Sequence, residues 1–289
     1  MTHPVTVGVD GSAEGHAAAE WAAEEAILRE APLRLVHAEE RWPTVFGAMP
    51  PVDPAEHPTG AQGLLEESAG RLRDRHPGLD VSVKRRVGRA AGVLAVEAAD
   101  AQMLVLGSRG RGRLEQFFVG SVGMATIGLT DTPVVLVRAS EEPGATEPRQ
   151  DIVVGVDIHE TPDAVLAFAF DEAARRACGV RAVHGWTVPF AFSYAPQLDP
   201  GVLKEVAEGM AGTLSEMLRP WRQRYPSVKT GERVLVGAPA EQLLSEATDA
   251  ALVVVGRRIR RSPVGGHLGH VAHAVLHHVA APVAVVAHD

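Results

Sequence analysis

The stretch that decides the fold is MLVLGSRGRGRLEQFFVGS, residues 103–121. Its first residues, 103–106, form an apolar run that is typical of a buried strand. Several glycines follow, among them Gly107, Gly110 and Gly120 at motif spacing. Glycine permits a positive φ and lets the backbone approach a ligand closely. The stretch therefore predicts a strand that ends in a loop able to contact a ligand.

The same loop is positively charged. Arg109, Arg111 and Arg113 lie between the glycines, and Gly120-Ser121 marks the start of a predicted helix. The first amides of a helix have no partner within it and attract anions. The loop is thus predicted to hold phosphate, which makes nucleotide binding the leading hypothesis. A purely structural role for Gly107 at the strand end and for Gly120 before the helix is the alternative.

Composition restricts the class of protein. A chain of 289 residues with 46% hydrophobic and 22% charged residues is long enough for two globular domains. The net charge of -8 disfavours nucleic-acid binding. The single cysteine, Cys178, fits a reducing, cytoplasmic setting and is expected to be a packed thiol. Neither a signal peptide nor a membrane span is expected.

An internal repeat divides the chain. VTVGVD at 5–10 recurs as IVVGVD at 152–157, displaced by 147 residues. TPV at 132–134 returns as APV at 281–283, displaced by 149 residues. So constant a displacement along the whole chain indicates duplication of one domain. We expect domains at 1–139 and 151–289, joined by a polar linker at 140–150.

Each copy alternates apolar runs with helical patterns. Continuous apolar runs indicate strands that are buried on both faces of a parallel sheet. Ser12 is a candidate N-cap for the first helix. The pattern predicts an α/β fold, an open doubly wound sheet with helices on both faces. In the first copy the expected strands are 5–10, 33–39, 81–87, 103–107 and 134–138, and the expected helices are 13–30, 62–75, 89–100 and 121–131.

The ligand site of such a sheet lies outside the carboxyl ends of its strands. Asp10 follows the first strand and Gly107 ends the fourth. If these two strands are neighbours, both residues reach one crevice. A role for Asp10 in a turn or a helix cap is the alternative.

With these residues in hand, the chain resembles the universal stress protein family. The resemblance rests on Gly107-x2-Gly110-x9-Gly120-Ser121, on Val9-Asp10 after the first strand and on TPVVLV at 132–137. The duplicated layout is similar to tandem two-domain members from actinobacteria. The resemblance implies two five-stranded parallel sheets of order 3-2-1-4-5. It also implies a Rossmann-like ATP site, with or without Mg²⁺, and a regulatory role in the stress response.

The resemblance also implies roles for residues of the first copy. Asp10 would face adenine and ribose, and Ala38 would contact adenine through its backbone. The glycines of the loop would approach ribose and phosphates, with Ser121 donating a hydroxyl. The complete expected set is Gly8, Val9, Asp10, Ala38, Gly107, Arg109, Gly110, Gly120, Ser121 and Val122.

The second copy departs from the motif. Gly256 and Gly269 persist, but Ile259 replaces Gly110 and His270 replaces Ser121. If that position needs a positive φ, isoleucine costs roughly 1–2 kcal/mol there. We expect weaker or altered nucleotide binding. The expected set is Val156, Asp157, Gly185, Gly256, Arg257, Gly269, His270 and Val271.

Other features have less specific interpretations. Histidines at 267, 270, 273, 277 and 278 would share a helical face, but no metal is expected because acidic or cysteine partners are not evident nearby. This face is also a candidate pH-responsive surface. His37 and His184, at strand ends, are expected to be structural. The segments 41–60 and 187–201 are interpreted as lids over the nucleotide, as partner contacts or as ordinary loops.

Three classes of function remain open at this point. The first is a nucleotide-binding stress or signalling module, which we favour. The second is an enzyme such as a slow ATPase, although no Walker or hydrolase motif is present. The third is a nucleotide-independent scaffold. The two copies are expected to form a pseudo-dimer through their last strands, 134–138 and 283–287, and chains to form homodimers.

Overall fold

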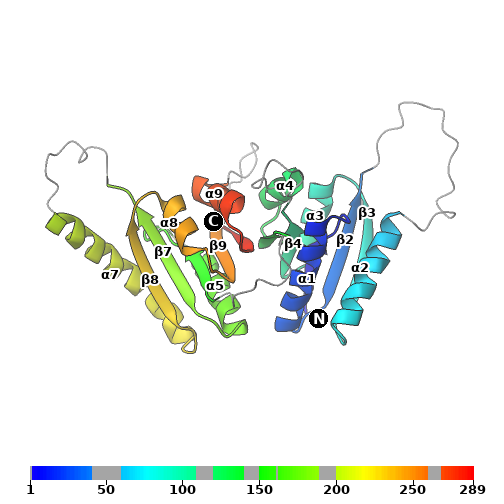
Figure 1. Ribbon diagram of the computed structural model, residues 1–289, viewed down its shortest axis with the longest axis horizontal. Helices are drawn as coiled ribbons and strands as arrows, with labels where there is room; N and C mark the ends of the chain where they lie inside the picture. Colours follow the sequence, from blue (N-terminus) through cyan, green and yellow to red (C-terminus); the bar gives the residue numbers. More distant parts are fainter. Residues whose placement is uncertain are drawn as a thin grey trace, which may run out of the picture. The chain divides into compact units, whose positions relative to one another are not determined.

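The computed structural model describes residues 2–40, 60–108, 120–139, 150–160, 162–188, 200–259 and 268–289. The chain divides into two compact units, residues 1–141 and 142–289. Each unit is a parallel sheet with helices packed against it (Figure 1). The predicted α/β class and the tandem arrangement are confirmed. Arg109, Gly110, the linker at 140–149 and most of the two expected lids lie outside the described residues.

The first sheet runs in the order β3-β2-β1-β4-β5, with every neighbouring pair parallel. Its strands are β1 (Val5–Gly8), β2 (Leu33–Glu39), β3 (Val81–Val87), β4 (Met103–Gly107) and β5 (Val134–Val137). The second sheet runs in the order β10-β9-β6-β7-β8 and is also parallel. Its strands are β6 (Ile152–Gly155), β7 (Val180–Trp186), β8 (Thr230–Val236), β9 (Leu252–Arg258) and β10 (Val283–His288).

Among the described residues, two pairs of helices accompany each sheet. In the first unit α1 packs with α2, and α3 packs with α4. In the second unit α5 packs with α7, and α8 packs with α9. The helices are α1 (Ala13–Leu28), α2 (Ala61–Arg75), α3 (Ala90–Ala98), α4 (Ser121–Leu129), α5 (Asp163–Arg175), α7 (Pro200–Arg224), α8 (Pro239–Glu246) and α9 (His270–His278).

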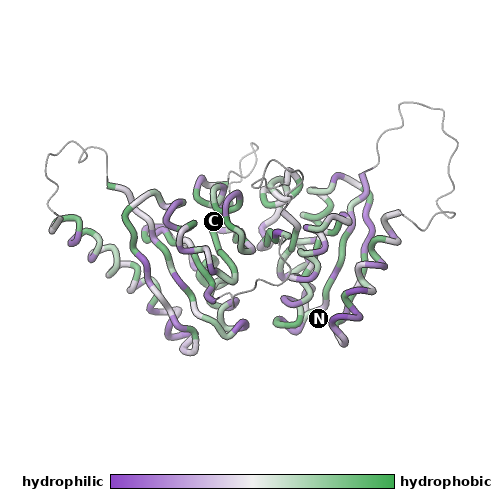
Figure 2. Tube along the Cα trace, viewed as in Figure 1, coloured by the Kyte–Doolittle hydropathy of each residue, from purple (hydrophilic) through white to green (hydrophobic). Residues whose placement is uncertain are grey.

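Burial explains the continuous apolar runs. The side chains of Val5, Val7, Leu104 and Val105 in β1 and β4 have no exposed surface. Both faces of these central strands are covered, so the strands lack the alternation of a half-exposed sheet. The edge strand β3 instead ends in charged residues, which discourage pairing with another chain. Figure 2 shows α2, whose outer face is charged, largely in hydrophilic colours.

The first helix of each unit starts differently. Ser12 caps α1, because its Oγ accepts a hydrogen bond from the amide of Gly15 at 3.0 Å. The predicted N-cap is confirmed. Helix α5 has no side-chain cap and begins at Asp163, three residues later than the repeat would place it. The first turn of α1 therefore has no helical counterpart in the second unit.

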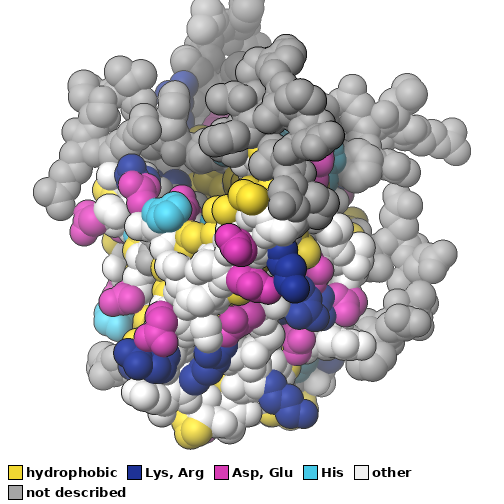
Figure 3. All heavy atoms as spheres, turned by 90° about the vertical axis from the view of Figure 1, so that its left-hand side faces the viewer, with side chains coloured by type: hydrophobic (Ala, Val, Ile, Leu, Met, Phe, Trp, Pro, Cys, Tyr) yellow, Lys and Arg dark blue, Asp and Glu magenta, His cyan; other side chains and the backbone are white. Residues whose placement is uncertain are grey.

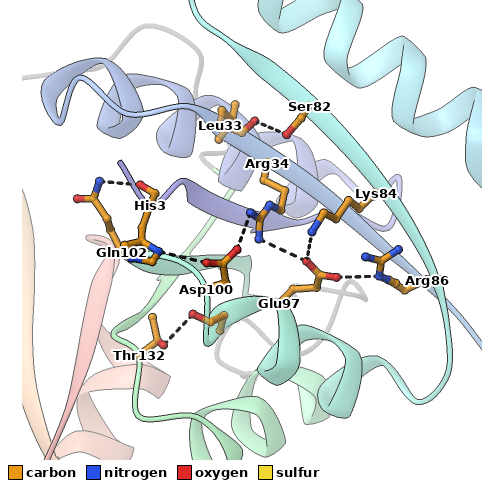
Figure 4. A network of polar contacts seen from close by, with 11 residues as sticks. His3, Leu33, Arg34, Ser82, Lys84, Arg86, Glu97, Asp100, Gln102 and Thr132 are labelled. Carbon is orange, nitrogen blue, oxygen red and sulfur yellow. Dashed lines mark hydrogen bonds and ion pairs between the residues drawn. The ribbon is translucent and has the colours of Figure 1, made fainter. Parts of the chain in front are cut away.

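A polar network fastens α3 to the first sheet (Figure 4). Glu97 of α3 contacts Arg34 of β2 and both Lys84 and Arg86 of β3. Burial alone would raise the pKa of Glu97, but the hydrogen bonds and charges of Lys84 and Arg86 outweigh it and hold this pKa below its usual value. The network fixes the helix that also carries Leu94, a wall residue of the cavity described below.

Figure 3 shows the face of the second unit that carries α7 and β8, where acidic and basic side chains are interspersed. Several form ion pairs, such as Lys204 with Glu208 and Arg219 with Glu216. These pairs are exposed and contribute little to stability. Neither sign of charge dominates this face.

Candidate functional site

The first unit holds a cavity of about 330 Å³ at the carboxyl ends of β1, β2 and β4. Most of the residues expected in the first site line it. They are Gly8, Val9, Asp10, Ala38, Gly107, Gly120 and Val122. Ser121 starts α4 and is exposed, and it does not line the cavity. Arg109 and Gly110 lie outside the described residues.

The pairing of β1 with β4 brings the two ends of the site together. Gly8 lies opposite Leu106 in this parallel pair. Asp10 and Gly107 therefore emerge next to each other at the same edge of the sheet. The predicted shared crevice is confirmed, and it follows from the strand order.

A tight turn sets the position of Asp10. Its Oδ1 accepts hydrogen bonds from the amide of Ser12, at 3.0 Å, and from the hydroxyl of Ser12. A Cβ at Gly15 would lie 2.8 Å from the same oxygen, so only glycine leaves room for it. Asp10 is therefore a turn residue, as the alternative interpretation held. A carboxylate has several acceptor positions, so this role is compatible with contact to a ligand.

Gly107 is required for a reason other than a positive φ. Its φ lies outside the left-handed region, but a Cβ on it would lie 2.6 Å from the carbonyl carbon of Glu14. The first turn of α1 packs directly on the end of β4, and this packing demands glycine. The contact is the structural role that was the alternative for Gly107, and close approach to a ligand stays a prediction.

Gly120 behaves differently. It is the N-cap of α4, with φ -61° and ψ 145°, and no side chain caps this helix in the described part of the chain. Any residue adopts that backbone conformation. Gly120 and Val122 line the cavity, so the start of α4 lies at its wall, with no side-chain cap among the described residues. Gly120 is not required by its backbone angles.

Residue-level prediction missed several cavity residues, namely Ser12, Gly15, His37 and Glu40. The Nδ1 atom of His37 lies 2.8 Å from the carbonyl oxygen of Val9. His184 repeats this contact with Val156 at 2.9 Å. The expected structural role of both histidines is confirmed, yet both also line cavities. His37 and His184 occupy matching positions in the repeat, and this signal could have identified them as cavity residues.

The second unit holds a corresponding cavity of about 420 Å³. It collects most of its expected set, namely Val156, Asp157, Gly185, Gly256, Gly269, His270 and Val271. Arg257 is the exception, because its side chain is 4% exposed and does not line the cavity. Successive side chains of β9 point to opposite faces, so Arg258 lines it instead. Arg258 forms an ion pair with Glu160.

Ile259 does not carry the expected strain. The described non-glycine residues with positive φ are Glu30 and Ala177, so Ile259 has an ordinary backbone. Its amide donates to the carbonyl oxygen of His288, which continues the pairing of β9 with β10. β9 ends at Arg258, and this hydrogen bond extends its pairing by one residue, to the position at which a glycine turn was expected. The conditional penalty of about 1–2 kcal/mol does not apply.

Two other expectations concern reactive groups. Burial raises the pKa of the half-buried Cys178 thiol, and the charges of Arg176 and Asp151 largely oppose each other there. The thiol is a packed one rather than an activated nucleophile.

In the described part of the chain, no three histidine, cysteine or acidic side chains gather to hold a metal ion. No described helix is long and apolar enough to cross a membrane.

Comparison with known proteins assigns the family. The model of the universal stress protein family matches residues 1–138 and 148–287. The chain therefore belongs to the universal stress protein family and carries two copies of its domain in tandem.

Relatives of the same length support this assignment. Universal stress protein Rv2005c of Mycobacterium tuberculosis is 32% identical over 98% of this chain and 96% of its own. A universal stress protein of Mycolicibacterium smegmatis is 34% identical over the same shares. The crystal structure of a universal stress protein from Archaeoglobus fulgidus covers 99% of both chains with a TM-score of 0.64. At 13% identity, that likeness is one of fold.

Some solved members of the family bind adenine nucleotides. One universal stress protein, 23% identical over 48% of this chain, was solved in complex with cAMP and has a TM-score of 0.34. Another, from Archaeoglobus fulgidus, was solved in complex with dAMP; it is 25% identical over 46% of this chain, with a TM-score of 0.35.

Proposed function

We propose that the first unit binds an adenine nucleotide, ATP with or without Mg²⁺, and that the protein is a nucleotide-responsive regulatory module of the stress response. In this proposal residues 1–139 and 151–289 are the two universal stress protein domains, and 140–150 links them. Family membership supports the regulatory role. The arrangement of the first cavity supports the ligand.

One observation carries the proposal. The uncapped first turn of α4, at Gly120 and Val122, faces the same cavity as Asp10 and the end of β2 at Ala38. Free amides at a helix start favour phosphate, and the carboxylate suits hydroxyl donors such as those of ribose. A phosphate end and a sugar end therefore lie in one cavity. Its volume is within the range of small-molecule sites.

The glycine at position 120 supports the same ligand. Its backbone angles suit any residue, so the helix start does not by itself demand glycine. A bare backbone there leaves space for phosphate oxygens beside the amides of α4. The expected contacts of Ser121, Arg109 and Gly110 are part of the proposal.

The test is calorimetric titration of nucleotide-stripped full-length protein with ATP. The Gly120→Glu variant places a carboxylate at the proposed phosphate position, and we expect it to abolish binding to the first unit. Gly269→Glu is the matched control, because it makes the same change at the start of α9 in the second unit. It should leave binding to the first unit intact. Absence of binding to wild-type protein at millimolar ATP would overturn the proposal and favour a scaffold.

Two further measurements separate the alternatives. Steady phosphate release that Gly120→Glu abolishes would make the protein an ATPase rather than a binding module. The proposal also includes pairing of the two domains within the chain and of chains into homodimers. Analytical ultracentrifugation with and without ATP tests the second part, because a dimer has twice the mass of the chain. A cytoplasmic location is proposed from the single cysteine.

A further inference from the structure

The two cavities differ at one point of the repeat. Above Gly107 in the first unit lies the backbone of Glu14, in the first turn of α1. Above Gly256 in the second unit lie the ring of His288 and the side chain of Val165, from the first turn of α5. A Cβ at Gly256 would lie 3.0 Å from Nε2 of His288. A titratable ring and the side chain of Val165 thus share the place that the backbone of a helix turn fills in the other unit.

His288 belongs to a set of charged and titratable groups around this cavity. It pairs with Arg258 across the β10–β9 ladder, and both line the cavity. His270 lines it from the first residue of α9. The full set among the described residues is Asp157 and Glu160 after β6, His184 of β7, Arg258 of β9, His270 of α9 and His288 of β10.

We propose that the second cavity is a proton-dependent site for a phosphate-bearing ligand, whose binding is coupled to protonation of His288 and His270. The class of ligand rests on the proposed function, but the dependence on protons rests on the residues of this cavity. The first cavity has no counterpart to these two histidines. His37 is its one described titratable nitrogen base, and that ring is bonded to the carbonyl of Val9.

The charge of the lining residues gives the direction of the effect. Among the described lining residues, with neutral histidines, the carboxylates of Asp157 and Glu160 outnumber the guanidinium of Arg258, so these residues disfavour an anion. Protonation of His270 and His288 makes cations the majority. Histidine changes charge between about pH 5 and 8. Anion binding should therefore strengthen as the pH falls through that range.

Exposure identifies His270 and His288 as the responsive groups, because a carbonyl contact does not separate the rings: the Nδ1 of His288 also lies 3.0 Å from the carbonyl oxygen of Asp289. His184 is 8% exposed and its Nδ1 is engaged by the carbonyl of Val156. This buried ring is therefore the least accessible of the three cavity histidines. His270 is exposed at the start of α9, where the helix dipole opposes a cation until an anion binds beside it. Proton and anion then stabilise each other.

The opposite end of the cavity favours a phosphate group over a base as the main contact. At Gly185, which corresponds to Ala38, a Cβ would lie 2.6 Å from the Cα of Pro239. The start of α8 thus closes on the strand end where the first unit carries an alanine. The ligand should be held mainly through its phosphates. Inorganic pyrophosphate is therefore a suitable probe beside ATP, and adenosine is the probe that lacks an anion.

The test uses full-length Gly120→Glu protein, in which the first unit is silenced. Pyrophosphate, ATP and adenosine are titrated calorimetrically at about pH 6 and about pH 8. For the two anions we expect tighter binding at the lower pH, by up to about tenfold per pH unit for each proton taken up. Adenosine should show no such gain. His288→Gln should remove most of the gain, and His288→Lys should retain binding at the higher pH.

Matched variants keep the test decisive. His273 is an exposed histidine of α9, like His270, but it does not line the cavity. His273→Gln should therefore behave as the parent protein. His270→Gln gives a second route if a change at His288 unfolds β10, which circular dichroism would reveal. Equal anion affinity at both pH values overturns this proposal. So does an equal gain in affinity at the lower pH in His288→Gln, His270→Gln and the parent protein. ATP binding to the first unit of wild-type protein would then still support the proposed function.

The experiment also distinguishes failure of the proposed function from failure of the second site. If wild-type protein shows no binding that Gly120→Glu removes, the proposed function of the first unit fails. Proton-dependent pyrophosphate binding that His288→Gln weakens would still support the second site.

Discussion

In the first unit the Nδ1 atom of His37 lies 2.8 Å from the carbonyl oxygen of Val9. This contact joins the end of β2 to the residue just before Asp10. In the second unit His184 makes the same contact with Val156, just before Asp157. Each unit thus uses a histidine to anchor the turn that carries its aspartate.

Loss of this anchor should loosen the turn. His37→Phe keeps a ring of similar size but leaves the carbonyl of Val9 without its donor, which costs about 1–2 kcal/mol. We expect faster hydrogen exchange of the amides at 9–15 and several-fold weaker ATP binding by the first unit. His3→Phe is the control, because His3 is exposed and contacts only Asp100 among the described ion pairs. Unchanged exchange at 9–15 in His37→Phe would refute the anchoring role.

Alanine should lower the free energy of unfolding at Gly107 and have little effect at Gly269. At Gly107 the new Cβ overlaps the backbone of Glu14, and overpacking of this kind costs about 1–3 kcal/mol. At Gly269 a Cβ meets no atom of the described residues within 4 Å, so Gly269→Ala should leave the free energy of unfolding nearly unchanged. Urea denaturation of both variants checks the difference. Equal stability of the two would contradict the packing assigned to α1 on β4.

Ala177 offers a stabilising substitution. Its φ is 52°, in the left-handed region, where a side chain costs about 1–2 kcal/mol. Ala177→Gly removes this strain but increases the entropy of the unfolded chain by about 0.5–1 kcal/mol. We expect a net gain of about 0.5 kcal/mol in the free energy of unfolding.

Ala174→Gly is the matched control for that change. Ala174 is also exposed, but it lies inside α5, where glycine lowers stability by about 1 kcal/mol. Thermal denaturation followed by circular dichroism compares the two. A lower midpoint for Ala177→Gly than for the parent protein would show that the strain is absent.

The lowered pKa of Glu97 predicts that the stability of the first unit depends on pH. Because its folded pKa lies below the ordinary value of 4.5, ionised Glu97 stabilises the first unit. This contribution is complete above about pH 4.5 and disappears as the pH falls through the lowered pKa. Glu97→Gln should therefore be less stable than the parent at neutral pH, and the difference should shrink in acid.

Urea denaturation between neutral and acidic pH measures this difference. Glu208→Gln serves as the control, since Glu208 is 66% exposed and its ion pair is with Lys204, four residues away. It should change stability by at most about 0.5 kcal/mol at any pH. A constant difference between Glu97→Gln and the parent over the whole range would contradict the assigned role.

Much of the first site could be predicted because its residues follow strand ends. Apolar runs are local signals, and they located β1 and β4 and therefore Asp10 and Gly107. Side-chain direction is less accessible from one sequence. Arg257 was expected in the second site, yet it is buried and Arg258 lines the cavity. The strand extends through both residues, which the expected glycine-type turn did not allow for.

The sequence by itself determined the duplication, the α/β class, the extent of most strands and the family, since repeats, periodicity and motifs are written along the chain. Only the tertiary structure decided why Gly107 must be glycine, that Ile259 is unstrained and that His288 enters the second cavity. These facts depend on contacts between segments distant in the chain, such as Glu14 with Gly107 and His288 with Gly256. Local pattern carries no information on such contacts, because packing between elements sets them.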